Sequence, residues 1–479
     1  MATAEVIARY ELTIGIECHV QLATRTKLFS AADNDARDKS PNDVVTPIDF
    51  GLPGMLPVLN RGAVDLAIRA GKALHADIAR VSRFDRKHYF YPDLPKGYQT
   101  TQMYQPIIGA GYIDAPLDDG ASVRVRIHHA HMEEDAGKLT HHGDYSLVDL
   151  NRAGTPLIEI VSEPDIHSAQ EARAYAAELH KLMTYAGVTY GDLYHGNMRF
   201  DVNVSVAPNG ASELGTRAEV KNLNSFRSVE RAAEYEFHRQ VELLEAGESV
   251  VQETRGWNDD KMITTSQRSK EDAQDYRYMP DADIPPIILT DDEIAAIQAE
   301  VPKLPPEYRT EFAPLGVDMS VITTVLSHQP LAEMVSQVVA KNVPAAKRVA
   351  NWVASNFTLD DEATLATVAA SDDLITLAAM TDAAEISSNA ASELFNDLMS
   401  GMTDPRAIAE SKHLLQVSDE AAIASIVDEV LADPASRASI DDINNGKDKA
   451  IGYLVGQVMK KSQGTANPAL AQRLIRERL

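Results

Sequence analysis

Apolar and polar residues alternate strictly in two segments of the first half of the chain. Every second residue is apolar from position 14 to 22, and the same period returns from 198 to 206. The apolar positions are Ile14, Ile16, Cys18, Val20 and Leu22 in the first segment and Met198, Phe200, Val202, Val204 and Val206 in the second. Because successive side chains of a strand point to opposite faces, each segment predicts a strand with one face in a core.

The polar faces of these two strands carry carboxylates among other polar groups. The first strand presents Glu17, His19 and Gln21, and the second presents Arg199, Asp201, Asn203 and Ser205. A third segment, 216–221, adds Arg217, Glu219 and Lys221 on one side. Residues two apart on a strand face are separated by about 6.5 Å, close enough to share one ion. The three segments together indicate a sheet with a chemically active face, although the first strand taken alone favours ordinary solvent-facing residues.

Farther along the chain the apolar period becomes helical. Residues 225–246 predict a helix that ends before Gly247. From about residue 290 onward, Ala, Leu and Val recur at helical spacing among Asp and Glu. We therefore predict an α+β fold, with a sheet-containing domain at 1–292, an all-α domain at 293–408 and an all-α tail domain at 409–479.

Composition limits the chemistry that this chain can perform. Its 479 residues carry a formal net charge of −26 and include one cysteine, Cys18. A single cysteine excludes a disulfide framework, a CxxC zinc site and an iron–sulfur cluster held by this chain alone. Its place on an apolar strand face predicts a buried thiol. No apolar run reaches the length of a membrane helix and no secretory signal is visible, so we expect a cytoplasmic protein without membrane contact.

The last 34 residues, 446–479, reverse the sign of the charge. They hold two acidic residues and the basic residues Lys447, Lys449, Lys460, Lys461, Arg473, Arg476 and Arg478. A charge run is usually a solvated surface. Within so acidic a chain, however, a segregated basic segment favours a partner that carries phosphates.

Two further segments are candidates for chemistry. The segment 131–138 places Glu133, Glu134 and Asp135 side by side, which costs stability unless a cation compensates. Hard oxygen ligands with at most one imidazole suit Mg²⁺ or Mn²⁺, so Glu133 or Glu134 is a candidate ligand, with an exposed acidic turn as the alternative.

The segment 83–99 interleaves cations with aromatic rings. Such a segment can stack a purine and neutralise phosphates, or it can be a rigid loop packed on the sheet. No Walker A sequence is present, so a nucleotide would be held by a sheet surface and a metal ion rather than by a phosphate-binding loop.

Taken together, the motifs resemble one family, GatB, the B subunit of the tRNA-dependent amidotransferase complex GatCAB. The resemblance covers nearly the whole chain. The matching segments are IGIECHVQL (14–22), GLPGMLPVLN (51–60), RKHYFYPDLPKGY (86–98), EEDAGK (133–138), DLNRAGTPLIE (149–159), MRFDVNVS (198–205), EVKNLNS (219–225), QETR (252–255), DYRYMP (275–280), GYLVGQVMK (452–460) and ANP (466–468).

The resemblance implies a catalytic cradle whose antiparallel sheet is similar to that of glutamine synthetase, then a helical domain and a YqeY-like tail that binds tRNA. The cradle would use ATP and Mg²⁺ to phosphorylate the side chain of Glu or Asp on mischarged tRNA(Gln) or tRNA(Asn). Ammonia from the amidase subunit, GatA, would then displace the phosphate. The small subunit, GatC, would complete a heterotrimer.

The resemblance also implies roles for particular residues. The expected magnesium ligands are Glu17, His19, Glu134, Asp201 and Glu219. Glu133 would be a further ligand or a base, and Glu133, Glu134 and Arg199 are the expected catalytic residues. Lys87, Lys96 and Tyr91 are expected to contact the nucleotide. Its phosphates are expected to be contacted by Lys87, Lys96 and Arg199. In the tail, Lys447, Lys449, Lys460 and Lys461 are expected to bind tRNA.

One departure and two alternatives accompany this hypothesis. Many relatives carry a CxxC…CxxC zinc knuckle, whereas residues 30–50 here hold no cysteine, so no zinc is expected. A noncatalytic tRNA-binding adaptor would explain the tail but leave the carboxylate strands idle. A stand-alone, metal-dependent kinase of a small acid would explain the strands but leave the basic tail without a purpose.

Overall fold

The computed structural model describes residues 3–269, 275–357, 368–416, 420–444, 447–462 and 466–479. The chain forms two compact units, residues 1–305 and 306–479. The first is mixed α and β and the second is helical, as the sequence predicted. The finer domain limits at 292 and 408 stay predictions. Among the described residues, no helix has both the length and the apolar character needed to cross a membrane.

The first unit is built on a sheet that has eight strands in the described part of the chain. Neighbouring strands are antiparallel except for one parallel pair, β11 with β12. In spatial order the strands are β13 (Ile263–Ser269), β12 (Glu253–Asn258), β11 (Ala218–Leu223), β10 (Met198–Pro208), β1 (Tyr10–Gln21), β9 (Pro156–Ser162), β6 (Ser122–Glu134) and β5 (Gly111–Pro116). Both strands predicted from alternation, β1 and β10, therefore lie side by side at the centre.

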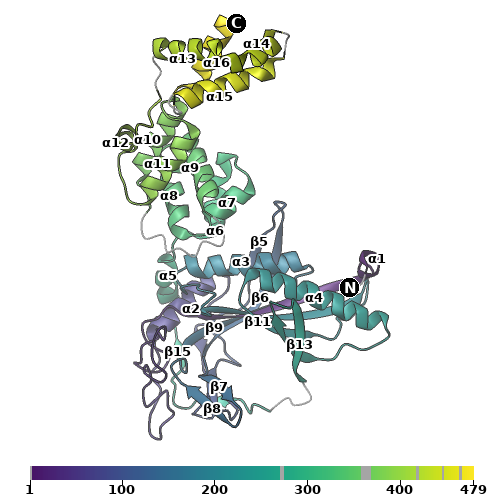
Figure 1. Cartoon of the computed structure of the whole chain (residues 1–479). Coiled ribbons are helices and arrows are strands. Elements are labelled where there is room, and N and C mark those ends of the chain that lie inside the picture. Colours follow the sequence, from purple (N-terminus) through teal and green to yellow (C-terminus); the bar gives the residue numbers. More distant parts are fainter. Residues whose placement is uncertain (1–2, 270–274, 358–367, 417–419, 445–446, 463–465) are drawn as a thin grey trace. The chain divides into compact units, whose positions relative to one another are not determined.

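Two helices, α3 (Ala169–Tyr185) and α4 (Phe226–Glu245), cover one face of this sheet (Figure 1). The apolar positions of β1 and β10 face them and are buried, Cys18 included. The predicted helix at 225–246 is confirmed as α4. Ser225 caps it by accepting a hydrogen bond from the Ser228 amide, and Gly247 follows with a positive φ of 75°.

Smaller elements complete the first unit. Three short strands form one additional sheet, and two pairs of strands form ribbons. Helix α5 (Asp291–Ala299) packs against α2 (Arg61–Ala73), which keeps residues beyond 292 within the first unit. The remaining elements are α1 (Ala4–Ile7), β3 (Asp85–His88) between β14 (Met279–Pro280) and β4 (Tyr98–Thr101), β2 (Val81–Ser82) with β15 (Ile287–Ile288), and β7 (Lys138–His142) with β8 (Tyr145–Asp149).

In its described residues, the second unit is built of helices. Its first helices are α6 (Pro305–Phe312), α7 (Met319–Val325), α8 (Gln329–Val339), α9 (Val343–Asn356), α10 (Ser371–Asp382), α11 (Ser388–Met399) and α12 (Pro405–Ser411). Those that follow are α13 (Glu420–Ala432), α14 (Arg437–Asn444), α15 (Ile451–Lys461) and α16 (Pro468–Arg478).

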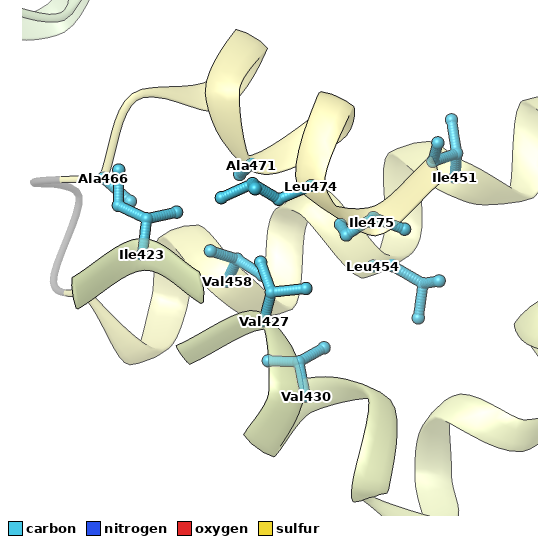
Figure 2. Close-up of a cluster of buried hydrophobic side chains, with 10 residues drawn as sticks. All are labelled: Ile423, Val427, Val430, Ile451, Leu454, Val458, Ala466, Ala471, Leu474 and Ile475. Carbon is cyan, nitrogen blue, oxygen red and sulfur yellow. The ribbon is translucent and has the colours of Figure 1, made fainter. Parts of the chain in front are cut away.

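A separate hydrophobic cluster holds the last of these helices together. Figure 2 shows Ile423, Val427, Val430, Ile451, Leu454, Val458, Ala471, Leu474 and Ile475 converging from α13, α15 and α16, together with Ala466 from the segment just before α16. Positions three and four apart on a helix share a face, so each helix contributes one apolar stripe. The charged residues of the tail are thereby left on the outside.

Candidate active site

The strand register brings polar residues from distant parts of the sequence into one row. His19 on β1 lies opposite Arg199 on β10 and, on its other side, opposite Glu159 on β9. Glu159 in turn lies opposite His131 on β6. Paired residues of antiparallel strands share a face of the sheet. We call this side the carboxylate face; it also carries Glu17, Glu133, Asp201 and Glu219.

One group on this face has the arrangement of a cation site. His19, Glu133 and Glu159 each offer a ligand atom, and these atoms all lie within 4.8 Å of one another. The Nε2 atom of His19 is 3.5 Å from Glu133 Oε1 and 3.6 Å from Glu159 Oε2. A second imidazole, that of His131, places its Nε2 3.2 Å from Glu159 Oε2. The sequence identified His19 and Glu133 as candidates for such a site, and the structure adds Glu159.

The two carboxyl groups of this cluster differ in their electrostatics. Burial raises the pKa of Glu133, and the opposing charge of His19 is too small to reverse this. Burial also acts to raise the pKa of Glu159, but the hydrogen bond and charge of His131 outweigh it and bring the pKa to about 2. The same contact raises the pKa of His131 against the effect of burial. The contact with His131 therefore favours the charged form of Glu159, whereas burial favours the neutral form of Glu133.

A second group, Glu17, Asp201 and Glu219, lies on the adjoining strands β1, β10 and β11. Burial, followed by the charges of Glu159, Glu219 and Asp201, raises the pKa of Glu17. The Lys221 ammonium lies 2.9 Å from Asp201 Oδ2 and 3.0 Å from Glu219 Oε1. The structure therefore brings together three of the expected magnesium ligands and surrounds them with further carboxylates.

Neutral side chains hold individual oxygens of this second group. Asn203 Nδ2 donates a hydrogen bond of 3.1 Å to Glu17 Oε1. Thr254 Oγ1 donates one of 2.9 Å to Glu219 Oε2. These contacts orient the two carboxylates without neutralising them.

Glu134 occupies a different environment. Its Oε1 atom accepts hydrogen bonds from the Lys96 ammonium and, at 2.9 Å, from the Thr100 amide. It is buried at the end of β6, so the alternative of an exposed acidic turn is wrong. It is not part of the group formed by His19, Glu133 and Glu159. Its role as a magnesium ligand stays a prediction.

The expected nucleotide contacts lie at different depths. Lys87 Nζ sits 4.8 Å from the centre of the Tyr276 ring, and its charge acts on Glu133 and Glu159. Lys96 is paired with Glu134 and Tyr91 is about half exposed. Arg199 Nη2 donates to Asp135 Oδ2 at 2.9 Å. Lys87 and Arg199 are thus the members of this set that bring positive charge to the carboxylate face.

A hollow of about 480 Å³ opens beside Glu17. Polar side chains and small residues from β1, β10 and the segments before β11 and β12 line it, among them Thr13, Asn203, Ser205, Arg217 and Gln252. Its volume falls within the range of small-molecule sites. The hollow therefore places room for a ligand next to the second carboxylate group.

The expected tRNA-binding lysines lie on the surface of the tail. Lys447 pairs with Asp442 at 2.9 Å and Lys461 with Glu429 at 3.0 Å. Lys449 and Lys460 are exposed. The predicted basic segment begins at Gly446, which lies outside the described residues. Contact of these lysines with tRNA stays a prediction.

Sequence reasoning missed two residues of the candidate site, Glu159 and His131. Glu159 interrupts the otherwise apolar run Leu157–Val161, and a single carboxylate in such a run was an available signal. His131 sits two residues before Glu133 and so shares its face of β6. Neither signal shows which strand lies alongside, so the pairing of these residues with His19 was not visible.

The sheet, its buried carboxylates and the adjoining hollow have the arrangement of a candidate catalytic domain whose sheet face could hold a cation. A family model of the GatB/GatE catalytic domain matches residues 12–295, and a model of the GatB domain matches residues 333–479.

Full-length relatives agree with these matches. The B subunit of the aspartyl/glutamyl-tRNA(Asn/Gln) amidotransferase of Alcanivorax borkumensis is 45% identical over 98% of this chain and 99% of its own. The protein of the same name from Alkalilimnicola ehrlichii is also 45% identical, over 98% and 99%. That of Synechococcus sp. (strain JA-2-3B'a(2-13)) is 43% identical over 98% of both chains. The chain belongs to the GatB family of amidotransferase subunits, which confirms the resemblance seen in its motifs.

Proposed function

We propose that this chain is the subunit that activates the aminoacyl side chain in a glutamine-dependent tRNA amidotransferase. The γ-phosphoryl group of ATP is transferred to the side-chain carboxylate of Glu or Asp on mischarged tRNA(Gln) or tRNA(Asn), which forms an acyl phosphate and ADP. Ammonia supplied by the amidase subunit, GatA, then forms the amide, and phosphate leaves. The observation that carries this proposal is the gathering of five carboxylates and two imidazoles on one sheet face.

The residues of this face suit a magnesium ion. Carboxylate oxygens are the ligands that Mg²⁺ prefers, and one imidazole is tolerated. His19, Glu133 and Glu159 would hold one ion, and Glu17, Asp201 and Glu219 would hold a cation near the nucleotide. Bound there, Mg²⁺ would offset negative charge on the phosphates. Glu134 remains a candidate ligand or a support for Lys96.

The other polar residues position the reactants. The hollow beside Glu17 offers hydrogen-bonding groups for the nucleoside half of ATP. Lys87 and Arg199 offer positive charge for phosphate oxygens, which favours transfer by stabilising developing charge. Glu133 has an alternative role to that of a ligand: if it does not bind the ion, its raised pKa, caused by burial, suits it to accept the proton that ammonia loses when the amide forms.

The rest of the assembly follows from the same hypothesis. The basic tail would bind tRNA through phosphate contacts, and the cradle would seat GatA and GatC in a cytoplasmic heterotrimer. The likeness of the cradle to glutamine synthetase belongs to this proposal as well. This hypothesis is favoured over the two alternatives because neither a tRNA adaptor nor a small-acid kinase uses both the carboxylate face and the tail.

ATP hydrolysis by the reconstituted heterotrimer tests the proposal. We expect turnover of ATP that depends on Glu-tRNA(Gln) or Asp-tRNA(Asn), with the acyl phosphate trapped by hydroxylamine as a hydroxamate on the tRNA. If this chain were a noncatalytic adaptor, it would hydrolyse no ATP. If it were a small-acid kinase, it would turn over ATP without tRNA, and either result would refute the proposal.

A further inference from the structure

Lys221 bridges the two carboxylates at the β10–β11 edge of the carboxylate face. Its ammonium contacts Asp201 Oδ2 and Glu219 Oε1 at 2.9 and 3.0 Å. Those side chains are 13% and 25% exposed, so water screens the charges only in part. The lysine thus supplies a cation at the oxygens that a divalent ion would use.

The contacts around Asp201 and Glu219 indicate that the Lys221 ammonium is the partner that a divalent ion could replace. Thr254 holds the other oxygen of Glu219, and Asn203 holds one oxygen of Glu17, each by a neutral hydrogen bond. For Asp201 and Glu219, the ion pairs found among the described residues are both with Lys221. Its side chain is 39% exposed and long enough to swing away, whereas the carboxylates are fixed on strands.

Charge supports the same interpretation. Glu17, Asp201 and Glu219 bring three negative charges to this end of the face, and Lys221 returns one positive charge. Buried like charges destabilise a fold unless a cation lies among them. In the absence of a metal ion, Lys221 performs that role.

We propose that Lys221 is an internal counter-cation which competes with divalent ions for Asp201 and Glu219 and, once displaced, pairs with the phosphates of the bound nucleotide. The second step rests on the proposed function, since it requires ATP at this face. The lysine then makes cation binding at this group depend on the nucleotide: without ATP the ammonium opposes the ion, and with ATP it has another anionic partner.

An ordinary structural ion pair makes the opposite prediction. If Lys221 only keeps Asp201 and Glu219 in place, its removal loosens the group and weakens divalent-ion binding. If it competes, its removal strengthens binding. The sign of the change therefore decides between the two.

Titration of the full-length chain with Mn²⁺, followed by electron paramagnetic resonance of the free ion, measures that sign. Without nucleotide, Lys221→Met should bind Mn²⁺ about tenfold more tightly than the unmodified protein. Lys221→Gln, which keeps a hydrogen-bond donor but not the charge, should change in the same direction. Lys261→Met removes an exposed lysine from the β12–β13 turn of the same sheet and should change nothing.

A second titration uses a non-hydrolysable ATP analogue in the presence of Mn²⁺. Lys221→Met should bind the analogue about tenfold more weakly, while Lys261→Met should bind it normally. If Lys221→Met loses its fold in metal-free buffer, Mn²⁺ must raise its unfolding temperature more than that of the unmodified protein.

Two outcomes overturn the inference. If both Lys221 variants bind Mn²⁺ no more tightly than the unmodified protein does, Lys221 does not compete with the ion. If Lys221→Met binds the ATP analogue as well as the unmodified protein does, Lys221 does not pair with the nucleotide phosphates. If the unmodified protein itself binds no nucleotide, the proposed function and that second step fail, but the nucleotide-free Mn²⁺ comparison still decides whether Lys221 competes.

Discussion

The sheet unit and the helical tail both concentrate charge, but they do so in different ways. On the carboxylate face, charged groups from separate strands are largely buried and contact one another, as His19 does with Glu133 and Glu159. In the tail, charged residues are exposed and form ion pairs at the surface, as Lys461 does with Glu429. Buried charges shift pKa values and require partners, whereas exposed pairs contribute little. We therefore expect the activity of the carboxylate face to depend on individual residues, and binding by the tail to depend on the total charge of many residues.

The largest effect is expected from Glu159→Gln. The change removes an anion that His131 and His19 both contact, so amidation of mischarged tRNA by the heterotrimer should fall by about a thousandfold. The glutaminase activity of GatA should remain. Glu163→Gln, at the end of the same strand and outside the cluster, serves as the control. Near-normal amidation by Glu159→Gln would contradict the dependence on single residues.

Leu454→Ala tests the core that presents the tail charges. Leu454 is fully buried in the cluster of Figure 2, so its truncation should lower the free energy of unfolding by about 2–5 kcal/mol. Chemical denaturation of the full-length chain measures the change. Tyr453→Ala, at a neighbouring position that is 45% exposed, should cost far less. Equal losses would mean that the stripe on α15 does not hold the tail together.

Glu134→Ala tests whether Glu134 is a ligand of the magnesium ion or a partner that holds Lys96 in place. We expect amidation to fall by at least about a hundredfold, because the change leaves the Lys96 ammonium without its buried carboxylate. The glutaminase activity of GatA should persist. The Mn²⁺ affinity then sharpens the assignment, since loss of a ligand weakens it and loss of a support for Lys96 does not. Wild-type-like amidation would remove Glu134 from the site.

The smallest effect per residue is expected in the tail. Replacing Lys447, Lys449, Lys460 and Lys461 together by alanine should weaken tRNA binding by about tenfold at moderate salt. The slope of log affinity against log salt should become shallower by about one for each phosphate that the tail no longer binds. The control is Lys412→Ala on the acidic part of the helical unit. If one tail lysine accounted for the whole effect, the tail would depend on a single residue, as the carboxylate face does, and the contrast between the two regions would be wrong.

The sequence-based predictions succeeded for features that depend on neighbouring residues in the chain and failed for features that depend on distant ones. The strands β1 and β10, the helix α4 and the change to an all-helical region were predictable, because alternation and helical spacing are local. Glu17, Asp201 and Glu219 were recognisable as carboxylates on polar strand faces for the same reason. The pairing of Glu17 with Asp201, and the place of Glu219 on the next strand, depend on strand order and register, which local patterns do not contain.

Glu159 and Glu134 show where local reasoning stopped. Glu159 sits in a strand whose neighbours in space, β1 and β6, are distant in sequence, so only pairing made it a partner of His19. Glu134 follows Glu133 directly, and the sequence treated the two as similar. The structure separates them, since Glu133 faces His19 while Glu134 is held by Lys96 and Thr100.

The amino-acid sequence by itself determined the central strands β1 and β10, the helix α4, the change to an all-helical region and the family of the chain, because each of these depends on neighbours along the chain or on motifs within it. The tertiary structure decided which charged groups meet. Strand register and order set those encounters, and the free energy of a buried charge depends on what lies within a few ångströms of it rather than on its position in the sequence.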